Sequence, residues 1–229
     1  MIENKSGLMA FFALIFIASA VRAGAQASTG TAAGEVSSGT AAAQAAAAAS
    51  GAPTLAVQDL VASARVYKDV NAAGLTPEEK SARLKVKNKL SGILDLHEMA
   101  HLILVKHWDK LTPAQREKYA ALLAGLVEKV AYPQIEKYFN EDLAINYAGE
   151  KALPGGGTGV QTKIVYKEED LTLSTDFLLR PTDKGWRIYD VVTDGESLLL
   201  IYRNQHMSII KDKGFPELVK LMEKKLNAD

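Results

Sequence analysis

Three histidines and a glutamate lie close together in residues 97–107 and could hold a metal ion. His97-Glu98-x-x-His101 has the spacing of a zinc-binding helix, because side chains four residues apart share one helix face. Two imidazoles could then bind one ion while Glu98 activates a bound water. His107 stands where the metzincin pattern HExxHxxGxxH has its third ligand. The segment therefore offers the chemistry of a zinc-dependent metalloprotease.

The position of His107 argues against this site. At about 100° per residue, an unbroken helix turns His107 roughly 80–120° away from the other two histidines. Metzincins break the helix with glycine, whereas this chain has Leu104 between two β-branched residues, so we expect no bend there. Glu117 and Glu128 are alternative third ligands, but they fall on the polar side of the next expected helix. We therefore predict no catalytic residue, no metal site and no cofactor, and keep a zinc-dependent metalloprotease as an alternative.

Composition excludes several further classes of protein. The sequence has no cysteine, so disulfides, thiolate nucleophiles and thiolate-ligated metals are all absent. It contains 27 basic and 27 acidic residues, without a basic stripe of the kind that binds nucleic acid. We therefore expect a protein that is not an enzyme and has no nucleic-acid partner.

The first 25 residues have the pattern of a signal peptide. Lys5 precedes an apolar run over residues 8–20, which is shorter than the ~20 residues of a membrane-spanning helix. Ala23-Gly24-Ala25 fits a cleavage site, and Ala18-Ser19-Ala20 is a second candidate. The sequence predicts a soluble, exported mature protein, with an uncleaved N-terminal anchor as the alternative.

The remaining chain divides into a tether and one domain. Residues 26–53 are almost entirely Ala, Gly, Ser, Thr and Gln, too small and polar to offset the entropy of ordering. We predict a disordered tether there and a single domain over residues 54–229, which are enough for a sizeable core.

Apolar periodicity in this domain predicts helices first, then strands, then helices. Thr76 and Thr112 each begin a capped helix with proline at its first position, and Asp95 can cap the helix that carries the histidines. We expect Ser91-Gly92 to interrupt the second helix and Pro133 to kink or restart the fourth. The expected helices cover residues 55–73, 76–90, 95 onward, 112–139, 197–211 and 216 onward.

The period changes to two between the fourth helix and the helix at 197, which is typical of half-buried strands. The expected strands cover residues 143–147, 160–167, 171–180 and 186–192. Short connections make the sheet antiparallel. The sequence thus predicts an α+β domain with helices on one face of a four-stranded, mostly antiparallel sheet.

Three segments, in this order along the chain, carry a pattern of residues that belongs to a known family. Its positions are Asp95, Met99, Ala100, Leu104 and Trp108; Thr112, Pro113 and Gln115; and Trp186, Tyr189, Asp190, Val191, Gly195, Ser197, Leu198, Tyr202, Arg203 and Gln205. The three segments resemble the MlaC family, the toluene-tolerance-type periplasmic phospholipid-binding subunits of a bacterial lipid-transport system. The resemblance covers most of residues 55–229. Three residues depart from the family pattern: Val105 replaces a usual glycine, Glu196 an apolar residue and His206 a phenylalanine.

This resemblance implies a non-catalytic periplasmic carrier that moves phospholipids between the inner and outer membranes and maintains outer-membrane lipid asymmetry. An apolar cavity between helices and sheet would hold the acyl chains, since each buried methylene contributes ~0.8 kcal/mol. The implied partners are an inner-membrane permease complex with its lipid-binding subunit and an outer-membrane lipoprotein complex. An NTF2-like domain without a lipid cavity is the remaining alternative.

Apolar residues of the third and fourth helices and of the sheet are our candidates for lipid binding, together with a Tyr-Arg pair after the sheet. Arginine is included because its guanidinium suits two-pronged contact with phosphate. The candidates are Met99, Leu102, Ile103, Leu123, Leu126, Val127, Val130, Phe177, Leu179, Tyr202 and Arg203.

Overall fold

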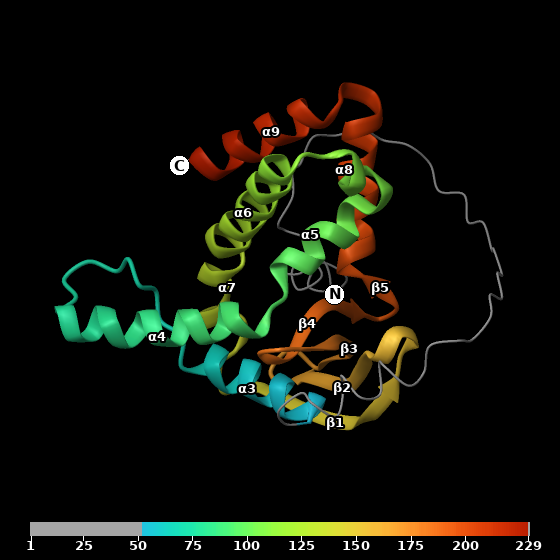
Figure 1. The fold of residues 1–229 in the computed structure, drawn as a ribbon. Helices are drawn as coiled ribbons and strands as arrows, with labels where there is room; N and C mark the ends of the chain where they lie inside the picture. Colours follow the sequence, from blue (N-terminus) through green and yellow to red (C-terminus); the bar gives the residue numbers. More distant parts are fainter. Residues whose placement is uncertain (1–51, 229) are drawn as a thin grey trace.

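The computed structural model describes residues 52–228 of the 229-residue chain (Figure 1). The predicted signal peptide, residues 1–25, lies outside the described residues, and so does the predicted tether, except for residues 52 and 53. Within the described part, helices and an antiparallel sheet form an α+β domain, as predicted.

Proline and capping residues set the beginnings of the two longest helices. The side chains of Thr76 and Thr112 each accept a hydrogen bond from the backbone N–H of the residue three positions on, Glu79 or Gln115. The side chain of that residue in turn accepts a hydrogen bond from the threonine backbone N–H. Both predicted capping boxes are thus confirmed, and each satisfies two donors that the first turn would leave without partners. The helices are α3 (Pro53–Arg65), α4 (Pro77–Ile93), α5 (Leu96–Leu104), α6 (Pro113–Val130), α7 (Tyr132–Tyr138), α8 (Leu198–Lys213) and α9 (Phe215–Asn227).

Two predicted helix ends are wrong. The first helix stops at Arg65 rather than near residue 73, and the chain then follows a loop in which Tyr67 and Val70 are buried. The second helix passes through Ser91-Gly92 and continues to Ile93. A single glycine costs a helix only about 1 kcal/mol, which tertiary contacts of the neighbouring residues can offset.

A third difference concerns the helix that carries the histidines. α5 ends at Leu104, and Val105 adopts φ 49° and ψ −130°, after which a 3₁₀ helix covers Val105–Lys110. The expectation of no bend at this point is therefore wrong. The turn places Trp108 and Leu111 in the helical core, and their burial stabilises a backbone conformation that local sequence disfavours.

The sheet has five strands in the order β1-β2-β3-β4-β5, all antiparallel, where the sequence predicted four. The additional strand is only two residues long and pairs with the end of β4, which is too short for a period-two pattern to reveal. The strands are β1 (Leu143–Ala152), β2 (Thr158–Tyr166), β3 (Leu171–Thr182), β4 (Gly185–Thr193) and β5 (Glu196–Ser197).

Side chains on one sheet face are buried and those on the other are largely exposed, as in β3, where burial alternates from Leu171 onward. Two apolar clusters result. One joins α5, α6, α8 and α9, and the other joins the sheet to α3. In Figure 1 the helical cluster stands above the sheet, with α7 and α4 beside the gap between them.

Candidate functional site

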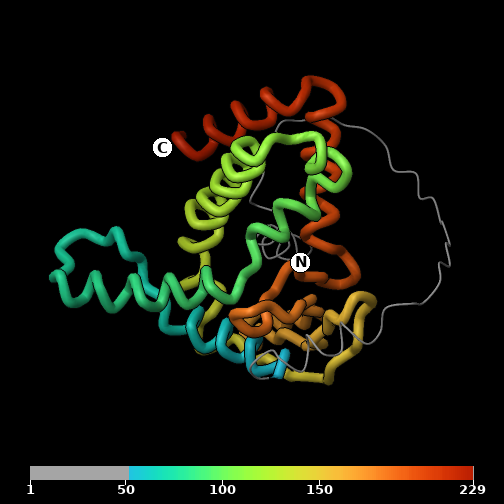
Figure 2. Tube along the Cα trace, viewed as in Figure 1, coloured from blue at the N-terminus to red at the C-terminus, as the bar shows by residue number. Residues whose placement is uncertain are grey.

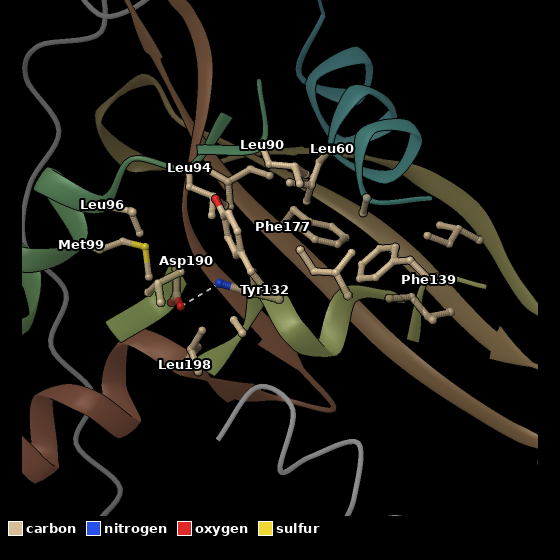
Figure 3. A pocket seen from close by; sticks show the side chains of 18 of the residues that line it. Leu60, Leu90, Leu94, Leu96, Met99, Tyr132, Phe139, Phe177, Asp190 and Leu198 are labelled. Carbon is tan, nitrogen blue, oxygen red and sulfur yellow. Dashed lines mark hydrogen bonds between the residues drawn. The ribbon is translucent and has the colours of Figure 1, made fainter. Parts of the chain in front are cut away.

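A cavity lies where the helical cluster meets the buried face of the sheet (Figure 3). Its wall draws on α3, α4, α5, α6, α7, α8 and strands β1 to β4. The lining residues are Leu60, Ala64, Leu90, Leu94, Leu96, Met99, Leu123, Val127, Ala131, Tyr132, Ile135, Phe139, Leu143, Ile145, Ile164, Tyr166, Phe177, Ile188, Asp190, Val191, Leu198 and Tyr202.

The cavity volume is about 140 Å³, counted as the space open to the centre of a water molecule. An apolar cavity of about 150 Å³ takes a small apolar ligand such as benzene. The cavity is therefore large enough for a narrow apolar ligand.

Almost every wall residue is apolar. The exceptions are Asp190 and three tyrosines, of which Tyr132 places its hydroxyl 2.7 Å from the Ser91 hydroxyl. Burial raises the pKa of Tyr132 and of Tyr166, so both phenols stay neutral across the physiological range. Such a wall offers neither a nucleophile nor a base to a ligand along most of its length, but it favours a hydrocarbon chain over water.

Asp190 reaches the cavity because of a β-bulge. Leu178 pairs with Asp190 but Leu179 pairs with Ile188, so Tyr189 is the extra residue in β4. Adjacent strand residues normally face opposite sides, yet Asp190 and Val191 both line the cavity. A bulge turns side chains in this way, and bulges are frequent beside functional sites.

The Asp190 carboxylate is 5% exposed and is held by three donors. Ser197 Oγ donates to Oδ2 over 2.6 Å, and the backbone N–H groups of Leu199 and Val191 donate to Oδ1 over 2.9 and 2.8 Å. Burial raises the pKa of Asp190, although these donors and the positive charge of Arg203 oppose the rise. The carboxylate thereby fastens β4 to the first turn of α8, and Figure 3 shows it at one end of the cavity beside Leu198.

Five of the predicted lipid-binding residues lie in the cavity wall: Met99, Leu123, Val127, Phe177 and Tyr202. Six lie elsewhere. Ile103 and Leu126 are in the helical cluster, where Leu102 and Val130 pack against it, and Leu179 is in the sheet cluster. Arg203 is half-buried on α8 and donates from Nε to the Leu102 carbonyl over 3.1 Å. Contact with lipid stays a prediction for all eleven.

The structure adds wall residues that the sequence prediction omitted. Examples are Leu60 on α3, Leu94 just after α4, Phe139 just after α7 and Ile145 on β1. The apolar stripe of the first helix contained a signal for Leu60 and Ala64, and strand alternation contained one for Ile145. No local pattern marked which residues of α7 face the cavity, because this depends on the direction in which the chain restarts a helix at Tyr132 after α6.

His107 of the zinc-like motif has a different aromatic neighbour from the other two histidines. The rings of His97 and His101 lie 5.6 and 5.5 Å from the Trp108 ring, whereas the His107 ring lies 5.7 Å from the Phe215 ring. Burial lowers the pKa of His107. Across residues 52–228, no group of three or more His, Asp or Glu side chains is placed to hold a metal ion.

Glu98, the residue that a protease would use as a base, takes part in an ion-pair network. Arg180 on β3 lies 3.0 Å from Glu98 and 2.8 Å from Asp95, and Glu98 is also 3.4 Å from His101. Asp95 caps α5 by accepting from the Glu98 N–H, and its own N–H donates to the Ile188 carbonyl. The network therefore joins α5 to the sheet at the edge of the cavity.

Fold and site together define an α+β domain that encloses an apolar cavity between its helices and its sheet. The family model described as MlaC protein matches residues 61–224, and the chain belongs to the MlaC family. This confirms the resemblance found in the sequence.

One similar solved structure is the phospholipid-binding protein from Ralstonia solanacearum in complex with a phospholipid. It shares 19% sequence identity with this chain, with a TM-score of 0.58, over 80% of this chain and 96% of the Ralstonia chain. The comparison with curated proteins gave no match. Within residues 52–228, no helix combines the length and apolar character needed to cross a membrane.

Proposed function

We propose that this protein is a periplasmic phospholipid carrier that moves lipids between the inner and outer membranes and so maintains outer-membrane lipid asymmetry. The observation that carries the proposal is the cavity wall, which is apolar except for Asp190 and the tyrosine hydroxyls. An acyl chain buried there keeps ~0.8 kcal/mol for each methylene shielded from water, which offsets the similar cost of taking that methylene out of a bilayer.

Family membership and fold support this proposal. MlaC proteins bind phospholipids, and the Ralstonia protein of the same fold is in complex with one. An export signal in residues 1–25, a tether in 26–53 and a lipid-binding domain over 54–229 fit a carrier that works between two membranes. Its partners would be an inner-membrane permease complex and an outer-membrane lipoprotein complex, and the transfer needs no catalytic residue.

Organic extraction of the purified protein followed by mass spectrometry tests the proposal. We expect a near-stoichiometric amount of phospholipid from the wild type. Val127→Trp, which adds a large ring to the wall, should lose most of this lipid while the protein stays folded by circular dichroism. Ala121→Trp on the exposed side of the same helix is the matched control and should retain the lipid.

Three results would contradict the proposal. A wild type that yields no phospholipid and transfers none between vesicles is not a carrier. Equal lipid content in Val127→Trp and Ala121→Trp would place the lipid outside this cavity. Stoichiometric zinc, with hydrolytic activity that His101→Ala abolishes, would assign the protein to the metalloprotease class instead.

A further inference from the structure

We propose that α4 is a membrane-docking arm that binds anionic phospholipid surfaces and brings the cavity to them. This inference rests on the proposed carrier function and adds the surface that the carrier recognises. It is argued from the charge, the exposure and the position of one helix.

Positive charge is concentrated on α4. Although the whole chain has equal numbers of basic and acidic residues, residues 80–94 contain five basic side chains and no acidic one. The two acidic residues of the helix lie in its first turn, where Glu79 is occupied by the capping box and Glu78 is exposed. The five basic residues are Lys80, Arg83, Lys85, Lys87 and Lys89.

Only part of this charge is neutralised by the rest of the protein. Lys87 pairs with Glu128 over 2.7 Å, and Lys89 pairs with Asp59 over 2.8 Å. Lys80 and Lys85 are exposed and form no ion pair with any residue in the part of the chain that the structure describes. Their charge is therefore available to an external anion.

The outer side of α4 also carries an apolar side chain. Leu84 lies between these two lysines in sequence and is 38% exposed. An exposed leucine beside lysines is typical of helices that lie at a lipid interface, where the leucine enters the acyl boundary and the ammonium groups contact phosphates. A free anion or a polar acidic protein surface would not use the leucine.

The helix is also placed to deliver lipid to the cavity. Its N-terminal half extends away from the rest of the domain, as Figures 1 and 2 show, while Leu90 near its other end and Leu94 just beyond line the cavity. A surface bound along α4 would lie next to the wall that receives acyl chains. This continuity favours a lipid bilayer over an acidic protein as the occupant.

Vesicle binding tests the proposal. The mature chain is mixed with vesicles of phosphatidylglycerol and phosphatidylcholine, or of phosphatidylcholine alone, at low and high salt, and bound protein is measured by sedimentation. We expect binding that needs the anionic lipid and weakens with salt. Lys80→Gln/Lys85→Gln should lose affinity roughly fivefold per lysine and on the order of 30-fold in total. Lys80→Arg/Lys85→Arg should keep it.

Lys163→Gln/Lys184→Gln is the matched control, since it removes the same charge from exposed positions of β2 and the β3–β4 turn. Equal affinity of this control and of Lys80→Gln/Lys85→Gln would overturn the inference. Binding of the wild type to both vesicle types alike, or to neither, would also overturn it.

Mass spectrometry of the carried lipid separates the two proposals. If every variant carries lipid but the α4 lysines do not affect vesicle binding, the carrier function stands and the docking role of α4 is wrong. If the wild type carries no lipid, the carrier function is wrong.

Discussion

At the scale of single residues, we expect a buried tyrosine–histidine pair to make the protein sensitive to acid. Tyr119 Oη and His206 Nδ1 lie 2.6 Å apart between α6 and α8, and His206 is fully buried at 0% exposure. Burial lowers the pKa of His206 from its ordinary value of 6.5 to about 3.

The sign of the pH effect follows from proton binding. Between about pH 6.5 and 3 the unfolded chain protonates this histidine and the folded protein does not, so the free energy of unfolding falls as the pH falls. The slope is up to about 1.4 kcal/mol per pH unit. Tyr119→Phe/His206→Phe, which removes both members of the pair, should flatten this slope in urea unfolding measured from pH 7 to 4.

Tyr119→Phe alone is the control, because it leaves the buried His206 side chain, and therefore the cause of its lowered pKa, in place. It should keep the slope of the wild type. An unchanged slope in the double variant would mean that another group causes the acid sensitivity.

At the scale of elements, the break between α5 and the following 3₁₀ helix is strained. Val105 has φ 49° and is 41% exposed, so a β-branched residue occupies a backbone region that favours glycine. Val105→Gly should raise the free energy of unfolding by about 1 kcal/mol, because released strain of ~1–3 kcal/mol exceeds the ~0.5–1 kcal/mol entropic cost of glycine.

Val66→Gly provides the comparison for urea unfolding midpoints. Val66 is 62% exposed with an ordinary φ of −101°, so the same substitution releases no strain there and should only destabilise. Similar losses at both positions would show that Val105 is unstrained.

The same break shows where local sequence stops being informative about elements. The capping boxes at Thr76 and Thr112 and the restart near Pro133 were predictable, because each is decided within a few residues. The turn at Val105 was not, since the residue type argues against it and the burial of Trp108 decides it. The strand β5 was not predictable either, because it consists of two residues that pair with the edge of β4.

At the scale of the whole molecule, the cavity itself was beyond local prediction. Periodicity identified Met99 and Ile103 equally as inward-facing. Only Met99 lies in the cavity wall, while Ile103 packs in the helical cluster. Whether a buried face meets packed atoms or open space depends on how far the helical cluster stands from the sheet. That spacing is set at a few junctions, such as Asp95 with Arg180 and Asp190 with Ser197.

A cavity lined by most elements of the fold couples ligand binding to stability. A ligand that binds only the folded state adds ~2.7 kcal/mol to the free energy of unfolding at 100 times its Kd. For a domain of this size each kcal/mol moves the Tm by ~2–4 °C, so a soluble single-chain phospholipid at that excess should raise the Tm of delipidated protein by roughly 5–10 °C.

Differential scanning fluorimetry measures this shift. Val127→Trp should show little of it, because the added ring occupies the wall, while Ala121→Trp should match the wild type. A shift of equal size in both variants would place the binding site outside the cavity, and a wild type without any shift would mean that the apolar space between helices and sheet does not take lipid.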